Sequence, residues 1–216
     1  MSTSISDLSV SLFFIHATVG LAIVSWWFLS QKKATLKNFG WGLLGYTLGM
    51  AAWTSVVLVK PADLKPLILV GVVPFLLGNL MFAKVASSKI DSKAGYLIGL
   101  VVALIVATFI ARTFFYPSDP YISEKGLLFF GLASVPVALY IATISVSFLP
   151  AIKVASSEIK EKSIKTIMTT GLTVLYVNAI ILVSAKDQTL LLINGVVISL
   201  AVLILWVKVL GSIKKA

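Results

Sequence analysis

The residues that could do chemistry in this apolar chain are few. His16 is the only histidine, and it could accept a proton or hydrogen-bond a neighbouring helix. One histidine with no carboxylates beside it in an apolar run makes neither a proton relay nor a metal site, so a structural role is expected. The other candidates for a ligand site or an ion pathway are amides and tyrosines, namely Tyr46, Asn79, Tyr140, Tyr176, Asn178 and Asn194. Interhelical hydrogen bonding explains each of them adequately, and we favour that reading.

No catalytic constellation is visible along the chain. There is no cysteine, and hence no disulfide, thiolate metal site or cysteine nucleophile. The sequence also lacks an HExxH motif, a nucleophile elbow, a pair of carboxylates within an apolar run and a second histidine for haem or metal. We therefore predict a protein that is not an enzyme, binds no metal and carries no cofactor.

Glycines spaced four apart predict close helix packing at two places. One pair is Gly45 with Gly49, and the other is Gly95 with Gly99. Small residues at this spacing let two helix backbones approach closely. The helix that each pair meets could belong to the same chain or to a second copy, so a homo-oligomer is one of the predicted alternatives.

The elements that must position these residues are long apolar runs. Of the 216 residues, 59% are hydrophobic and 12% charged. A bilayer core about 30 Å thick takes about 20 apolar residues per helical span, whereas barrel strands are shorter and alternate in polarity. The sequence thus predicts an all-α, single-domain integral membrane protein of the cell membrane. Its seven transmembrane helices are expected at about 9–29, 39–59, 66–86, 94–115, 126–149, 167–185 and 189–210.

Charge patterning predicts the orientation of these spans. Most of the 18 lysines and arginines follow the first, third, fifth and seventh runs, and the net charge is +10. The positive-inside rule then places the N-terminus outside and the C-terminus in the cytoplasm. The predicted partner is the lipid bilayer, with subunits of a membrane complex as an alternative. Nucleic-acid binding is not expected, because the lysines are spread over several short links.

One internal echo follows the third and fifth runs. Lys84-Val-Ala-Ser-Ser-Lys-Ile90 resembles Lys153-Val-Ala-Ser-Ser-Glu-Ile159. The prolines of the preceding runs, Pro74 and Pro136, lie at different distances from the echo, which argues against duplication of a helix pair. We therefore favour similar chemistry at two helix ends over a repeat.

Three short segments resemble the microbial rhodopsins, namely Pro74-Phe-Leu-Leu-Gly-Asn79, Ala138-Leu-Tyr-Ile141 and Gln188-Thr-Leu-Leu191. Helix count, orientation and short loops are similar too, and the resemblance implies a seven-helix bundle. Aligned through Gln188, the position of the retinal-binding lysine is Leu200, and the counterion positions are Val196 and Ile68. Covalent retinal is therefore not expected. The basic stretch 156–170 is similar to the link between helices 5 and 6 in the seven-helix sensor regions of histidine kinases.

These observations leave three functional hypotheses. The leading one is a non-enzymatic, rhodopsin-like protein that binds a small apolar ligand or a membrane partner in sensing or assembly. The second is a transporter or channel for a small solute or ion, lined by the amides and tyrosines named above. The third is an accessory subunit of a membrane complex.

Overall fold

The structure is a computed structural model that describes residues 5–59, 65–89, 94–115 and 135–184, together with isolated positions between 193 and 207. These ranges hold six α-helices and no strand, so the predicted all-α class is confirmed for the part of the chain described. The helices are α1 (Ile5–Leu29), α2 (Ala34–Val59), α3 (Lys65–Ser87), α4 (Ala94–Phe115), α5 (Val135–Ser157) and α6 (Lys162–Ser184).

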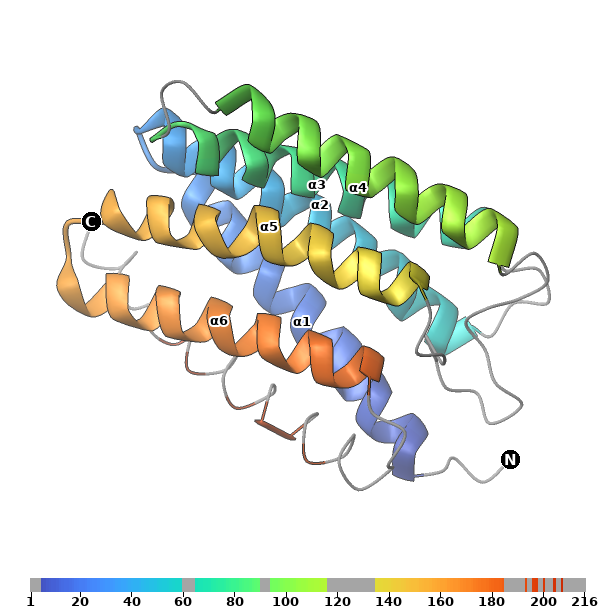
Figure 1. The fold of residues 1–216 in the computed structure, drawn as a ribbon. Helices are drawn as coiled ribbons and strands as arrows, with labels where there is room; N and C mark the ends of the chain where they lie inside the picture. Colours follow the sequence, from blue (N-terminus) through green and yellow to red (C-terminus); the bar gives the residue numbers. More distant parts are fainter. Residues whose placement is uncertain are drawn as a thin grey trace.

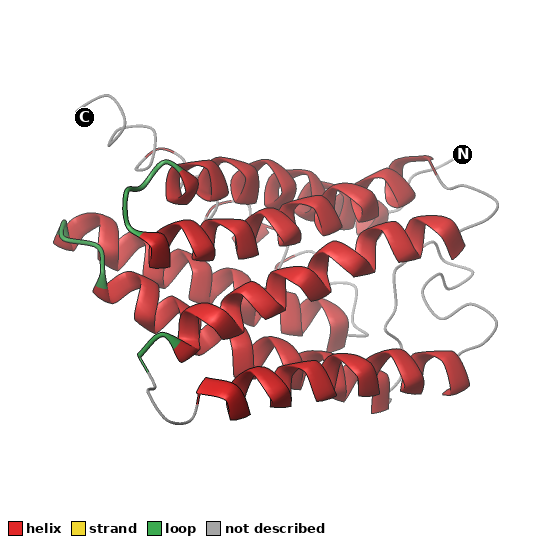
Figure 2. Cartoon of the chain, turned by 90° about the horizontal axis from the view of Figure 1, so that it is seen from above, coloured by secondary structure: helices red, strands yellow, loops and turns green. Residues whose placement is uncertain are grey.

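The six helices lie side by side in an elongated bundle (Figure 1). Each described helix packs on the next one along the chain, from α1 on α2 to α5 on α6. Helix α5 also packs on α3 and touches α2, so α3 and α5 form the middle of the bundle. Seen from above, the links 30–33 and 158–161 lie at one end of the bundle (Figure 2). Neighbours that pack antiparallel through short links are usual for helical bundles.

Aromatic rings from several helices fill the centre of this arrangement. Phe28 of α1 meets Phe39 of α2 with ring centroids 4.8 Å apart, and Phe39 meets Phe82 of α3 at 5.1 Å. Phe148 of α5 lies 4.8 Å from Phe82. These four rings are buried. Offset and edge-to-face pairs of this kind add to the free energy gained by burying the rings.

Glycines set the close approach of α2 to α3. A Cβ atom added at Gly45 would lie 2.5 Å from the backbone oxygen of Pro74 and 3.0 Å from the Cα atom of Gly78. A Cβ atom at Gly49 would overlap the ring of Phe75 at 2.4 Å. The two helices can therefore pack backbone to backbone where Gly45 meets Gly78, and the missing side chain of Gly49 leaves room for the Phe75 ring.

Although the described helices are apolar, they do not meet the criteria of length and hydropathy for a membrane span. Across the described ranges, no helix combines the length and the hydropathy that a membrane crossing requires. This finding contradicts the predicted seven-helix transmembrane bundle and the predicted integral-membrane location. A helix that is apolar all round can lie in a protein core as well as in lipid, and hydropathy alone does not separate the two. Here the rings of Phe28, Phe39, Phe82 and Phe148 lie in the core.

Several predicted boundaries also differ from the structure. Helices α1 and α2 begin four and five residues before the predicted 9 and 39. The run predicted at 126–149 corresponds to α5, which continues to Ser157, and the run predicted at 167–185 corresponds to α6, which begins at Lys162. The prediction ended one helix before Pro150 and began the other after Lys165, although α5 and α6 contain these residues. Pro136 lies in the first turn of α5, and Pro150 lies inside the helix, seven residues before its end. Most of the run predicted at 189–210 lies outside the described residues.

Candidate functional site

Asn79 of α3 and Ser147 of α5 are the two polar residues of the described chain with no exposed surface. Asn79 is the centre of a hydrogen-bond network. Its side-chain oxygen accepts hydrogen bonds from the hydroxyls of Tyr46, at 2.8 Å, and Ser147, at 2.7 Å. Its amide nitrogen donates to the backbone oxygen of Phe75 at 2.8 Å. One amide thus links α2, α3 and α5 at the centre of the bundle.

This arrangement follows from the packing around it. Tyr46 reaches Asn79 because Gly45, its neighbour in α2, lets that helix lie against α3. The Tyr46 ring stacks on Phe148 at 5.9 Å and meets Phe82 edge to face at 5.3 Å. A neutral amide whose oxygen already accepts two hydrogen bonds is suited to holding helices in register, because a buried polar group must be satisfied to be stable.

A second polar contact joins α5 to α6. The hydroxyls of Ser145 and Tyr176 hydrogen-bond each other, and Ser145 also donates to the backbone oxygen of Ile141. The Tyr176 ring lies 6.4 Å from Phe148, whose other neighbours include Tyr46. Two predicted tyrosines, Tyr46 and Tyr176, are therefore placed around the same phenylalanine.

The structure brings the predicted polar residues together only in part. Tyr46 and Asn79 are directly bonded. His16 is half-buried in α1. The side chains of Tyr140 and Asn178 and the whole of Asn194 lie outside the described residues. Their predicted role in lining a ligand site or pathway stays a prediction.

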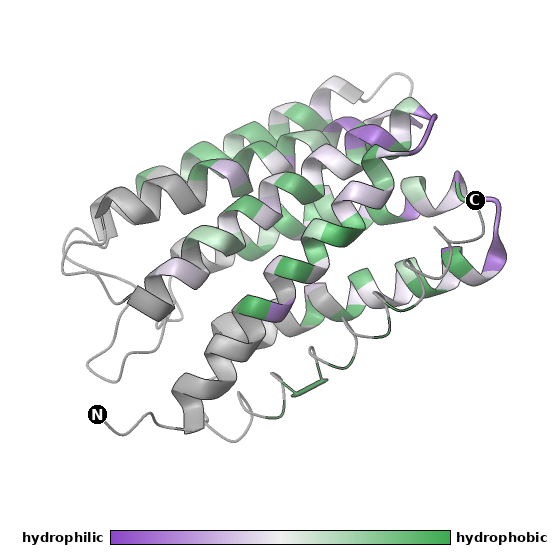
Figure 3. Ribbon diagram, turned by 180° about the vertical axis from the view of Figure 1, so that it is seen from behind, coloured by the Kyte–Doolittle hydropathy of each residue, from purple (hydrophilic) through white to green (hydrophobic). Residues whose placement is uncertain are grey.

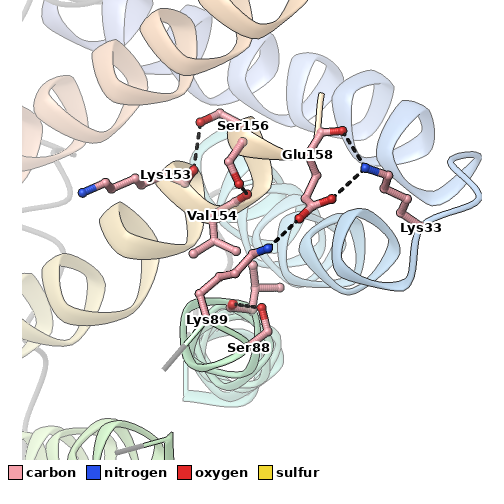
Figure 4. Close-up of polar contacts among 9 residues, drawn as sticks. Lys33, Ser88, Lys89, Lys153, Val154, Ser156 and Glu158 are labelled. Carbon is pink, nitrogen blue, oxygen red and sulfur yellow. Dashed lines mark hydrogen bonds and ion pairs between the residues drawn. The ribbon is translucent and has the colours of Figure 1, made fainter. Parts of the chain in front are cut away.

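Charged side chains gather at the end of the bundle where the described links lie, as the hydropathy colouring shows (Figure 3). Glu158, which follows α5, is the centre of this group (Figure 4). Its carboxylate lies 2.7 Å from the Lys33 ammonium and 3.0 Å from the Lys89 ammonium. Lys33 also donates to the backbone oxygen of Glu158 at 3.2 Å. The group thus joins the α1–α2 link, the end of α3 and the end of α5.

These contacts have an electrostatic consequence for Glu158. Hydrogen bonds from Lys33 and then Lys89, with the positive charge of both, lower the pKa of Glu158 from 4.5 to about 2. An acid beside two cations favours its ionised form. Glu158 therefore stays charged at every physiological pH.

The internal echo of the sequence proves to be a repeated helix end. Ser87 and Ser88 donate to the backbone oxygens of Lys84 and Val85 at 2.9 and 2.7 Å. At the end of α5 the corresponding serines, 156 and 157, donate to the oxygens of residues 153 and 154 at 3.0 and 2.7 Å. At both helix ends, serine hydroxyls thus bond to backbone oxygens of the preceding turn.

A third feature is the outer face of α4. Gly95, Gly99, Ala103, Val106 and Ile110 recur every three or four residues, so they share one helix face, and all five are exposed. No described atom lies within 4 Å of a Cβ atom built on Gly95 or Gly99. Unlike Gly45 and Gly49, these two glycines meet no helix of the described chain.

The described residues contain no group of three histidine, aspartate or glutamate side chains that could hold a metal ion. No protein-family model, no curated protein and no solved structure matches this chain. The described residues form an all-helical bundle with a buried amide network and one basic end.

Sequence reasoning missed several residues of these sites. Ser147 was overlooked because a serine in an apolar run carries no distinctive spacing. The pair of Lys89 and Glu158 was visible in principle, because the two residues occupy the same place in the two copies of the echo. A difference of charge at matched positions is a usable signal for two helix ends that lie together.

Proposed function

We propose that this protein is a non-catalytic helical bundle that works in assembly, by binding an apolar helix of a partner on the outer face of α4. The observation that carries the proposal is the exposed stripe of Gly95, Gly99 and Ala103. Three small residues spaced four apart leave a shallow track along which a second helix backbone can approach.

Larger apolar side chains continue this face. Val106 is 49% exposed and Ile110 is 53% exposed, and beside the stripe Tyr96 is 80% and Leu100 is 49% exposed. A contiguous apolar surface of this kind typically marks an interaction site. An aromatic ring at its edge could supply an anchor, since tyrosine is enriched at interfaces.

Two other observations support assembly over binding a small molecule in the interior. Aromatic rings occupy the centre of the bundle, and the side chain of Asn79 is engaged by Tyr46, Ser147 and Phe75. Apolar side chains are exposed on several described helices, and on α4 they adjoin the exposed small residues Gly95, Gly99 and Ala103.

The test is site-specific photo-cross-linking in cells that express the full chain. A cross-linking amino acid at Val106 is expected to give one discrete adduct, which a second substitution, Gly99→Leu, abolishes by filling the track. The same amino acid at Val177, an exposed valine of α6, serves as the matched position and is expected to give no such band. Identical adducts at both positions, or an adduct that survives Gly99→Leu, would refute the proposal.

A further inference from the structure

The basic end of the bundle carries more positive charge than its own acids balance. Among the described residues it holds two acids, Glu158 and Glu161, and nine exposed lysines. These are Lys32, Lys33, Lys37, Lys84, Lys89, Lys153, Lys160, Lys162 and Lys165. Of the nine, Lys33 and Lys89 are in ion pairs within the described chain, both with Glu158. The other seven lysines are offset by one exposed acid, Glu161, so this end keeps a net positive charge.

The contacts of Glu158 hold two lysine-bearing segments together. By holding Lys33 and Lys89, the carboxylate draws the α1–α2 link and the end of α3 against the end of α5. Lys160 follows Glu158 in the link 158–161, which lies at the same end of the bundle (Figure 2). Like charges gathered in this way repel one another and attract an extended anion.

Two exposed tryptophans flank this end. Trp26 is 56% and Trp41 is 54% exposed. Trp26 lies three residues before the end of α1 and Trp41 seven residues after the start of α2. At a rise of 1.5 Å per residue, the rings lie about 5 and 10 Å from the helix ends. Both tryptophans are therefore set back from the lysines at this end of the bundle and do not lie between them.

We propose that the basic end binds a surface of anionic phospholipid, with its exposed lysines on the headgroup phosphates. A nucleic acid would use aromatic rings placed between the lysines, and here the tryptophans lie along the sides of the bundle. The proposal does not depend on the partner of α4.

The experiment is flotation of the full chain with vesicles of phosphatidylcholine alone or of phosphatidylcholine with phosphatidylserine. Binding is expected on the anionic vesicles and is expected to be reversed by salt. Each exposed lysine near such a surface contributes about fivefold in affinity, so the double variant Lys160→Gln with Lys162→Gln should bind roughly 25-fold more weakly.

The matched control removes a negative charge, instead of positive charges, at a neighbouring position. Glu161→Gln removes one negative charge from the same link and should strengthen binding about fivefold. Both sets of substitutions are on exposed residues, so folding is expected to be unchanged. Equal binding to neutral vesicles, binding that salt does not reverse, or indifference to both sets would overturn the proposal. Binding to duplex DNA with the same lysine dependence, and none to vesicles, would overturn it in favour of a nucleic acid.

Discussion

The Lys89 ammonium lies 3.0 Å from the carboxylate of Glu158, and the two residues occupy equivalent places after two copies of the same Lys-Val-Ala-Ser-Ser segment. The ends of α3 and α5 are thus alike in their hydroxyl bonds and opposite in charge. Where two like helix ends lie together, one substitution of lysine by glutamate turns a repulsion into an attraction. The pairing explains why the echo differs at this position.

The ion pairs of Glu158 predict a dependence of stability on pH. Because its pKa in the folded chain is about 2 and its ordinary value is 4.5, the pairs stabilise the fold above pH 4.5. This contribution is lost as the pH falls from 4.5 toward 2. In thermal melts at low salt, Glu158→Gln should lower Tm at pH 7, and the difference from the wild type should vanish near pH 2. Glu161→Gln is the matched control, and an equal loss there would contradict the assignment.

The bond between Tyr46 and Asn79 predicts energetic coupling between α2 and α3. Tyr46→Phe removes one donor and should lower the free energy of unfolding by about 1 kcal/mol. Asn79→Leu removes the shared acceptor and should cost about 1 to 3 kcal/mol, because buried hydroxyls lose a partner. The double variant should lose less than the sum of the two, by roughly 1 kcal/mol. Strict additivity in denaturant melts would show that the bond contributes nothing.

Two glycine substitutions should have opposite effects on stability. Gly45→Ala places a methyl group 2.5 Å from the backbone oxygen of Pro74, so α2 and α3 must separate, at a cost of about 1 to 3 kcal/mol. Gly99→Ala meets no described atom and should stabilise α4 by about 1 kcal/mol through helix propensity alone. Denaturant melts of both variants test the pair. A destabilised Gly99→Ala would indicate that the outer face of α4 is covered in the purified protein.

Phe148 is predicted to be the most sensitive aromatic residue of the core. Its ring lies within 4.8 to 6.4 Å of the rings of Phe82, Tyr46, Phe39 and Tyr176, measured between centroids. Phe148→Ala should lower the free energy of unfolding by about 3 to 5 kcal/mol, because it removes buried area and leaves a cavity shared by four helices. Phe148→Leu should recover much of this loss. A loss of unfolding free energy below about 1 kcal/mol for Phe148→Ala would mean that Phe148 and its four neighbouring rings do not form one core.

The sequence by itself determined the helical class, the placement of the described helices to within five residues except at α5, and the gathering of lysines after α1, α3 and α5. These properties are local, since they follow from apolar runs and from the charges between them. The starts of α2 and α6 were predicted too late because lysine continues a helix as readily as it ends one. The end of α5 was predicted too early because the prediction stopped before Pro150, which lies inside the helix.

Only the tertiary structure decided what each apolar run lies against. Hydropathy is the same for a ring in the core and a ring outside it, so it could not tell that Phe39, Phe82 and Phe148 meet. The prediction of membrane spans was wrong because no described helix has the length and hydropathy that a crossing requires. Spacing alone likewise could not separate Gly45, which packs on α3, from Gly99, which meets no described atom. Which partner a residue has is a long-range property, set by how six helices share one interior, and no window along the chain contains it.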